Sequence, residues 1–302
     1  MKHLLKLLDL TGDEIIEILN LADQLKYESK NGIQHHVLAG KSLGMIFEKS
    51  STRTRVSFEV GMYQLGGQAL FLSKNDLQMG RGEPIEDTAR TLGRYLDGIM
   101  IRTFEQSTVE QLAQWSGIPV INGLTDFAHP CQVLADLMTI REFKGTLKGL
   151  KLCFIGDGNN MMNSIIVGGL KAGLDISVAC PGGQYDPAKE VLEWAYDCDK
   201  FSSHTDPREA VKGADVVVTD VWSSMGHEGQ ESERAKAFAG YQINDDLMNL
   251  ADGDAIVLHC LPAHRGEEIT AEVFERHANV IFEEAENRLH AQKAVMAKLM
   301  AD

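Results

Sequence analysis

The sequence predicts an α/β protein of two domains, each a parallel β-sheet that is flanked by helices. Short apolar runs alternate with amphipathic stretches along the whole chain, which is typical of βα units. Several of these runs are apolar throughout, as in strands that are covered on both faces. A polar, glycine-containing break at 144–149 is followed at once by a new apolar run. We therefore expect a first domain over 1–145 and a second over 146–302.

The elements follow from the two periodicities of the pattern. The apolar runs predict strands at 43–47, 68–72, 98–101, 119–121, 152–155, 176–179, 216–219, 255–259 and 280–282. Amphipathic stretches between them predict helices at 13–29, 54–65, 86–95, 107–116 and 131–143. A terminal helix over about 286–302 is expected to pack back on the first domain.

Composition excludes several classes of protein. The 302 residues are 44% hydrophobic and 24% charged, which is typical of a soluble globular protein. A net charge of -15 argues against a general affinity for nucleic acid. No apolar run is long enough for a transmembrane helix, and no signal-peptide pattern opens the chain. We expect a cytoplasmic protein that binds neither nucleic acid nor a membrane.

Cofactor motifs are weak. Five cysteines occur without any Cys-x-x-Cys pair, which argues against a disulfide framework or a structural zinc site. The Gly156-Asp157-Gly158 turn would need a third glycine at position 161 for a dinucleotide fingerprint, but Met161 stands there. We expect neither a metal nor an organic cofactor.

The segment Ser51-Thr52-Arg53-Thr54-Arg55 is the most informative part of the sequence. It joins a predicted strand to a predicted helix, and a helix start offers unpaired N–H groups and the positive end of the helix dipole. Three hydroxyls and two guanidiniums in the same turn suit a small dianion such as phosphate. The alternative is an ordinary helix cap with solvated arginines.

Other polar residues follow predicted strands, where open α/β sheets bind their ligands. Arg102 closes one apolar run, although a surface ion pair would also explain it. His129 and Gln132 are three residues apart at a helix start, so both can reach one small ligand. His129 could donate to a polarised carbonyl, and Gln132 could hold an amide nitrogen. Since both halves contribute such residues, we expect the active site in a cleft between the domains.

His259 and Cys260 resemble a base and a nucleophile. On an extended segment, adjacent side chains point to opposite sides, so a direct dyad is not expected. Cys260 could line a site or fill a gap in the core. A cis peptide at Leu261–Pro262 would turn backbone carbonyls toward a ligand.

Together these motifs resemble the aspartate/ornithine carbamoyltransferase family over essentially the whole chain. The resemblance rests on Ser51-Thr52-Arg53-Thr54-Arg55 and His129-Pro130-Cys131-Gln132, in this order and with Arg102 between them. The ornithine branch is indicated by Asp220-Val221-Trp222-Ser223-Ser224-Met225-Gly226, His259-Cys260-Leu261-Pro262 and Glu286-Asn287-Arg288.

The resemblance implies transfer of the carbamoyl group of carbamoyl phosphate to the δ-amine of L-ornithine, which gives L-citrulline and phosphate. It implies a role in arginine biosynthesis and a homotrimer, or a multiple of trimers, built by the first domain. The implied catalytic residues are Arg102, His129 and Cys260. The implied carbamoyl-phosphate ligands are Ser51, Thr52, Arg53, Thr54, Gln78, Arg102, His129, Gln132, Cys260, Leu261 and Arg288. The implied ornithine ligands are Asn160, Asp220, Ser224 and Met225.

Several alternatives stay open from the sequence. Asn163 competes with Asn160 as the direct ornithine ligand, and Gln78 could belong to a solvated loop. The amine acceptor could be putrescine or an N-acylated ornithine. The chain could also be a catalytically silent homologue or an NAD-dependent oxidoreductase. Whether the reaction serves synthesis or breakdown is left open as well.

Overall fold

The computed structural model describes residues 1–223 and 229–301, and the chain divides into two compact units. Unit 1 comprises Met1–Met138 and Asn287–Asp302, and unit 2 comprises Thr139–Glu286. Two continuous helices, α5 (Pro130–Lys144) and α12 (Ala278–Met300), pass from one unit into the other. The sequence predicts the boundary between residues 145 and 146, one residue beyond the end of α5, whereas the two units divide between Met138 and Thr139, within that helix.

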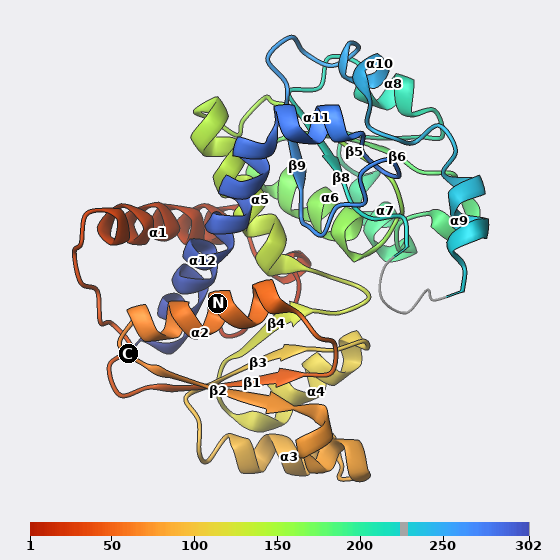
Figure 1. The fold of residues 1–302 in the computed structure, drawn as a ribbon. Coiled ribbons are helices and arrows are strands. Elements are labelled where there is room, and N and C mark those ends of the chain that lie inside the picture. Colours follow the sequence, from red (N-terminus) through yellow and green to blue (C-terminus); the bar gives the residue numbers. More distant parts are fainter. Residues whose placement is uncertain (224–228, 302) are drawn as a thin grey trace. The chain divides into compact units, whose positions relative to one another are not determined.

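Unit 1 is built on a four-stranded parallel sheet in the order β2-β1-β3-β4 (Figure 1). The strands are β1 (Ser42–Phe47), β2 (Gln68–Ser73), β3 (Gly98–Arg102) and β4 (Val120–Leu124). Helix α2 (Thr52–Gln64) covers one face, and α3 (Ile85–Leu92) and α4 (Gln106–Ser116) cover the other (Figure 1). The unit also holds α1 (Gly12–Lys30) and the short helices η1 (Leu7–Asp9), η2 (Lys74–Asp76) and η3 (Gln78–Arg81).

Unit 2 contains a five-stranded parallel sheet in the order β7-β6-β5-β8-β9. The strands are β5 (Lys151–Ile155), β6 (Asp175–Ala179), β7 (Phe201–His204), β8 (Val216–Thr219) and β9 (Ile256–His259). The helices are α6 (Asn160–Ala172), η4 (Gly183–Tyr185), α7 (Lys189–Ala195), α8 (Pro207–Val211), α9 (Glu231–Ala237), α10 (Asp245–Met248) and α11 (Ala271–Arg276). The strand order reverses between β5 and β8, which is where such sheets bind ligands.

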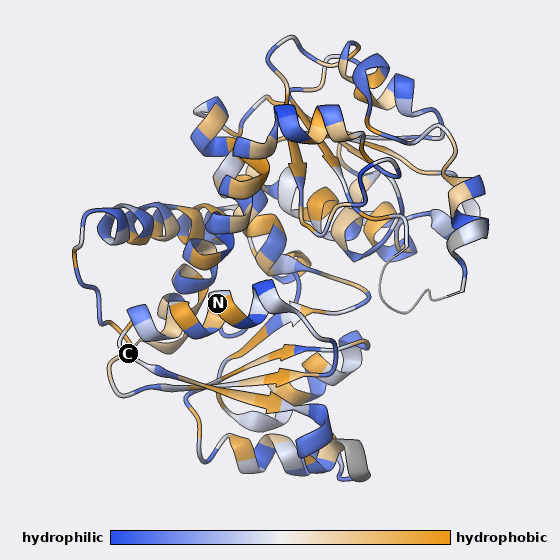
Figure 2. Ribbon diagram, in the orientation of Figure 1, coloured by the Kyte–Doolittle hydropathy of each residue, from blue (hydrophilic) through white to orange (hydrophobic). Residues whose placement is uncertain are grey.

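The inner strands of both sheets are hydrophobic along their length (Figure 2). In unit 1 every residue of β3 is buried, since this inner strand is covered on both faces. In unit 2 one face of the sheet shares a core with residues of α8, α10 and α11. The described residues include no helix with the length and apolar character needed to cross a bilayer.

The prediction of two parallel sheets flanked by helices is confirmed, with two corrections. The strand predicted at 280–282 is wrong, because these residues belong to α12. Val280 and Ile281 are buried while Phe282 is 57% exposed, so their apolar character serves a helix face. Strand β7 was missed because Phe201-Ser202-Ser203-His204 has no apolar run. As an edge strand with a single neighbour, β7 does not need one.

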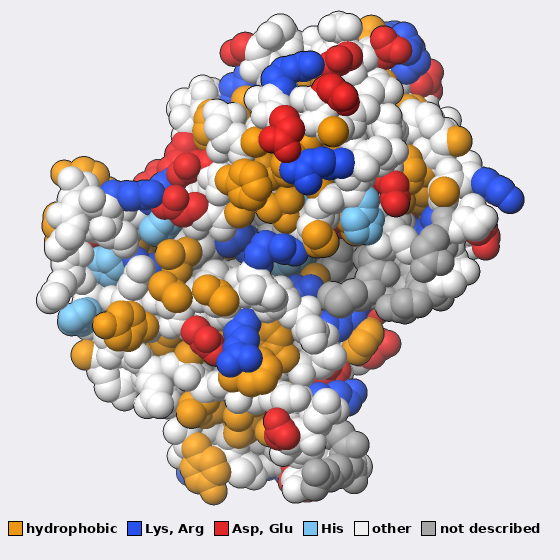
Figure 3. Space-filling view, viewed as in Figure 1, with side chains coloured by type: hydrophobic (Ala, Val, Ile, Leu, Met, Phe, Trp, Pro, Cys, Tyr) orange, Lys and Arg blue, Asp and Glu red, His pale blue; other side chains and the backbone are white. Residues whose placement is uncertain are grey.

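The surface of unit 1 carries exposed apolar side chains on α2 and on the edge strand β2. They are Val56, Val60, Tyr63, Leu70 and Phe71. The space-filling view shows hydrophobic side chains interspersed with charged ones on this face of the molecule (Figure 3).

Candidate active site

The turn that is predicted to bind phosphate, Ser51–Arg55, follows β1 and opens helix α2. Ser51 is the N-cap, in extended conformation, and its hydroxyl oxygen accepts a hydrogen bond from the Thr54 amide at 3.2 Å. The Ser51 hydroxyl also donates to Thr54 Oγ1 at 3.1 Å, and Thr54 is buried. Capping is thus part of the role of Ser51. The other amides of the first turn of this 13-residue helix are directed out of the helix end, as an anion site requires.

The two arginines of this turn differ. Arg53 is exposed at the start of α2. The guanidinium of Arg55 lies 3.9 Å from the ring centroid of Phe71, and its Nε donates to Glu59 Oε1 at 3.0 Å. Arg55 therefore serves a surface contact with β2 and α2. Arg53 is the arginine of this turn that we retain as a phosphate ligand.

Arg288 of α12 joins three helices of unit 1 that are far apart in sequence. Its guanidinium is buried and donates to Gln132 Oε1 at 2.6 Å and to Thr54 Oγ1 at 3.3 Å. Gln132 lies in the first turn of α5, and its Nε2 donates to Asp136 Oδ1 at 2.8 Å. A fixed positive charge therefore lies beside both predicted substrate-binding motifs.

Arg102 and His129 belong to the same positive environment. Arg102 is the buried last residue of β3, and its carbonyl accepts the Glu48 amide at 2.9 Å. Burial, and then the charges of Arg288 and Arg102, hold the pKa of His129 well below its usual value. The imidazole is therefore neutral near pH 7 and carries one N–H donor. Such a donor suits a carbonyl oxygen that gains negative charge.

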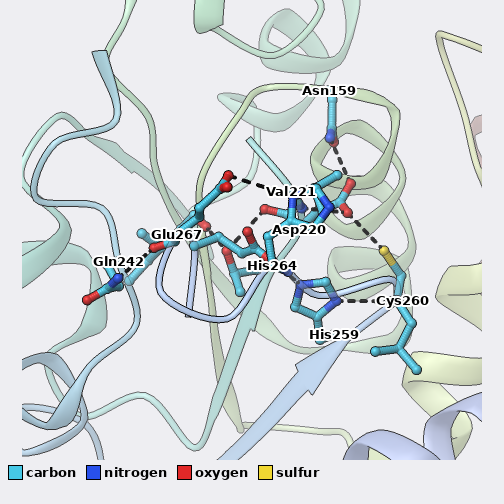
Figure 4. A network of polar contacts seen from close by, with 12 residues as sticks. Asn159, Asp220, Val221, Gln242, His259, Cys260, His264 and Glu267 are labelled. Atoms are coloured by element: carbon cyan, nitrogen blue, oxygen red, sulfur yellow. Dashed lines mark hydrogen bonds and ion pairs between the residues drawn. The ribbon is translucent and has the colours of Figure 1, made fainter. Parts of the chain in front are cut away.

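Asp220, which directly follows β8, is the centre of the polar network in unit 2 (Figure 4). Its carboxylate accepts from Asn159 Nδ2 at 2.9 Å, from its neighbour's amide, that of Val221, at 2.8 Å and from Cys260 Sγ at 3.1 Å. Cys260 thus lines this network and is not a core filler. A hydrogen bond from this sulfur to a carboxylate requires the thiol form of the cysteine.

His259 faces away from this group, as expected. Its Nδ1 accepts the Leu261 amide at 2.9 Å, so the proton lies on Nε2 and is directed to Glu268 Oε1 at 2.9 Å. The prediction that His259 and Cys260 form no dyad is confirmed. The Leu261–Pro262 peptide is cis, as the sequence suggested, and Leu261 has a positive φ of 58°.

Three asparagines lie at or near the predicted ornithine site, and the structure gives them different roles. Asn159, to which the sequence assigned no ligand role, caps α6 and contacts Asp220. Its position between β5 and an amphipathic helix was the available signal, because asparagine is a favoured N-cap. Asn163 is buried, and its Oδ1 accepts the Ala188 amide at 2.9 Å, so it holds a loop. Asn160 is half-buried in the first turn of α6, and its role as ornithine ligand stays a prediction.

The remaining predicted ligands are Ser224, Met225 and Gln78. Ser224 and Met225 lie outside the described residues. Just before them, the carbonyl of Trp222 accepts a hydrogen bond from buried Arg234, which also pairs with Asp157. Gln78 is exposed at the start of η3, where its backbone carbonyl accepts the Glu83 amide at 3.2 Å. Its role in a carbamoyl-phosphate site stays a prediction.

Two family models match nearly the whole chain. The carbamoyl-P binding domain of aspartate/ornithine carbamoyltransferase matches residues 2–142, and the Asp/Orn binding domain matches residues 148–299. The chain belongs to the aspartate/ornithine carbamoyltransferase family. The motifs at Ser51–Arg55 and His129–Gln132 lie within the first of these matches, and Asp220 and Cys260 lie within the second.

Relatives that match over nearly their full length are named ornithine carbamoyltransferase. The chain is 58% identical over 301 residues to the ornithine carbamoyltransferase of Syntrophotalea carbinolica, with 99% of each chain covered. It is 55% identical over 307 residues to that of Carboxydothermus hydrogenoformans, covering 99% of this chain and 97% of the relative.

Solved structures of the family agree with this fold. Ornithine carbamoyltransferase from Pyrococcus furiosus matches with a TM-score of 0.95 and 52% identity, over 99% of this chain and 97% of that one. The anabolic ornithine carbamoyltransferase from Campylobacter jejuni matches with a TM-score of 0.93 and 45% identity, over 99% of both chains.

Proposed function

We propose that this chain is an ornithine carbamoyltransferase, which transfers the carbamoyl group of carbamoyl phosphate to the δ-amine of L-ornithine. The products are L-citrulline and phosphate. Full-length relatives at 55% and 58% identity carry this name. The observation that carries the proposal is the buried guanidinium of Arg288, which is hydrogen-bonded to Thr54 and Gln132 and which adds to the effect of burial in lowering the pKa of His129.

Most residues of the proposed carbamoyl-phosphate site belong to unit 1, and Leu261 belongs to unit 2. Ser51, Thr52, Arg53, Thr54 and Arg102 bind the phosphate, whose negative charge grows as the bond between carbon and oxygen breaks. Thr54, Arg102 and His129 donate to the carbonyl oxygen as it becomes an oxyanion. Loss of one such donor typically costs about 3 kcal/mol in the barrier. Gln132 Oε1 and the backbone carbonyl of Leu261 accept from the carbamoyl NH2 group, and Arg288 completes the site.

The proposed amine site lies in unit 2. Asp220 holds an amino group of ornithine, Cys260 helps to position the attacking nitrogen, and Asn160, Ser224 and Met225 bind the amino-acid end. The amine attacks the carbonyl carbon directly, so no acyl-enzyme is needed. The nitrogen sheds two protons overall, of which one ends on the departing phosphate and one in solvent. In this proposal the two groups of residues act on one reacting pair.

The cellular setting and the assembly are proposed from the family. We propose a cytoplasmic enzyme of arginine biosynthesis that forms a homotrimer through its first domain, and Gln78 helps to close a carbamoyl-phosphate site across a subunit boundary. The exposed apolar side chains of α2 and β2 in unit 1 are consistent with such an assembly. Sedimentation equilibrium of the purified chain tests the trimer.

Initial rates with three amines test the proposed substrate. Ornithine, putrescine and N-acetylornithine are each supplied with carbamoyl phosphate, and phosphate release and the carbamoylated product are measured. We expect citrulline formation from ornithine to dominate. A strong preference for putrescine would overturn the substrate assignment, and inactivity with all three amines would favour a silent homologue. Binding of NADH, followed by its fluorescence, would instead favour an oxidoreductase.

A further inference from the structure

Asp136 is a buried carboxylate that the proposed mechanism does not use. It lies on α5, one helical turn after Gln132, and its side chain is 1% exposed. Its Oδ1 accepts a hydrogen bond from Gln132 Nε2 at 2.8 Å. Both residues lie in unit 1, as does Arg288, which donates to the other end of the same amide.

These two neighbours determine which way the Gln132 amide faces. A carboxylate only accepts hydrogen bonds, and a guanidinium only donates them. With Nε2 toward Asp136 and Oε1 toward Arg288, both contacts are charge-assisted hydrogen bonds. Rotating the amide by half a turn would set oxygen against oxygen and N–H against N–H. The orientation of Gln132 is therefore fixed before any ligand arrives.

The orientation has a consequence for ligand choice. An amide oxygen has two lone pairs, so Gln132 Oε1 can accept a second N–H beside the one from Arg288. A carbamoyl group offers an NH2 group at this place, whereas an acetyl group of nearly the same shape offers a methyl group. We propose that Asp136 is a positioning residue that makes the site select carbamoyl phosphate over acetyl phosphate. This inference rests on the proposed function, in which Gln132 contacts the carbamoyl nitrogen.

Asp136→Asn tests the inference, because it keeps the size of the side chain and removes the obligatory acceptor. An asparagine at 136 can face Gln132 with either end, so only Arg288 still disfavours the reversed orientation of the glutamine. We expect the KM for carbamoyl phosphate to rise roughly ten- to hundredfold, the range for one charge-assisted hydrogen bond. The inhibition constant of acetyl phosphate, measured in competition with carbamoyl phosphate, should change less than about twofold.

The ratio of the KM for carbamoyl phosphate to the inhibition constant of acetyl phosphate distinguishes a change in the orientation of Gln132 from general loosening of the site and from loss of charge. General loosening of the site, or loss of a negative charge near the phosphate, would change both constants together. Asp87→Asn is the matched control, since it makes the same chemical change in an exposed pair with Arg90 on α3. Asp136→Ser, which leaves room for a water, provides the same test if the asparagine variant does not fold.

Each outcome has a separate meaning. If the wild type prefers carbamoyl phosphate to acetyl phosphate, and the Asp136 variant loses this preference while the control keeps it, the inference is supported. Discrimination that survives in both Asp136 variants within about twofold overturns the inference and leaves the proposed function standing. A wild-type enzyme that binds both phosphates equally well overturns the contact between Gln132 and the carbamoyl nitrogen, and the inference with it.

Discussion

Replacing Arg288 by methionine separates catalysis from stability at one position. Arg288 is 4% exposed, and its guanidinium donates hydrogen bonds to Gln132 at 2.6 Å and to Thr54 at 3.3 Å. Methionine has a similar length and no charge. The variant loses a positive charge from the proposed phosphate site and two contacts that position proposed ligands.

The catalytic loss should be large. One preorganised donor is worth about 3 kcal/mol in the transition state, or about 150-fold in rate. Since Thr54 and Gln132 also lose their support, we expect kcat/KM for carbamoyl phosphate to fall roughly 100- to 1000-fold.

The stability change should be small, because opposite effects offset one another. Two lost hydrogen bonds to a charged group cost about 1.5 to 3 kcal/mol each. Removing a buried charge in favour of an apolar side chain returns about 1 to 4 kcal/mol. The midpoints of these two ranges leave an expected net loss of about 2 kcal/mol in the free energy of unfolding in urea.

The assay is steady-state citrulline formation at varied carbamoyl phosphate, with urea unfolding on the same preparations. Arg276→Met on α11 is the control, because that arginine forms an exposed pair with Asp245 at 2.8 Å. Its kcat/KM should stay within about twofold of wild type. If Arg288→Met kept more than about a fifth of the wild-type kcat/KM, the reasoning about the buried guanidinium would be wrong.

Three further predictions concern single groups. Arg53→Ala should abolish nearly all activity while leaving the fold intact, because Arg53 is exposed at the start of α2; a variant that keeps most activity refutes its role as a phosphate ligand. Since the pKa of His129 is held well below its usual value, kcat/KM should show no acid limb from this residue near pH 6.5. An inflection near pH 6.5 that disappears in His129→Asn would contradict this. Burial lowers the pKa of Lys293 to about 8, and its Nζ donates to Ser29 and Gln64. Lys293→Met should therefore raise the free energy of unfolding by about 1 to 2 kcal/mol at pH 7. From about pH 8 to 10 the unfolded wild type holds more protons than the folded one, so wild-type stability rises with pH and the gain should shrink. A gain that is constant from pH 7 to 10 would exclude the buried ammonium as its cause.

Much of the site follows from local sequence. Ser51 is a polar cap between an apolar strand and a helix, and the structure finds it in that position. The opposite orientation of His259 and Cys260 follows from the alternation of side chains along extended backbone. The capping role of Asn159 follows from local sequence, whereas its contact with Asp220, which lies 61 positions away, does not.

The wrong strand at 280–282 and the missed strand β7 both result from contacts that local sequence does not show. Val280 and Ile281 have strand-like side chains, and only their burial in α12 shows that they serve a helix face. Strand β7 lacks an apolar run, and its pairing with β6 is what makes it a strand. In both cases packing against distant residues overrides a weak local preference.

By itself, the sequence determined the two α/β domains, the order of their main elements, the family and the residue types of both half-sites. These depend on short-range periodicity, caps and motifs, which are properties of neighbouring residues. Only the tertiary structure decided that Arg288 reaches Gln132 and Thr54, at separations of 156 and 234 residues, and that Asp136 orients the glutamine. Such contacts arise when packed helices bring distant side chains together, and the direction of each hydrogen bond depends on where donors and acceptors meet in space.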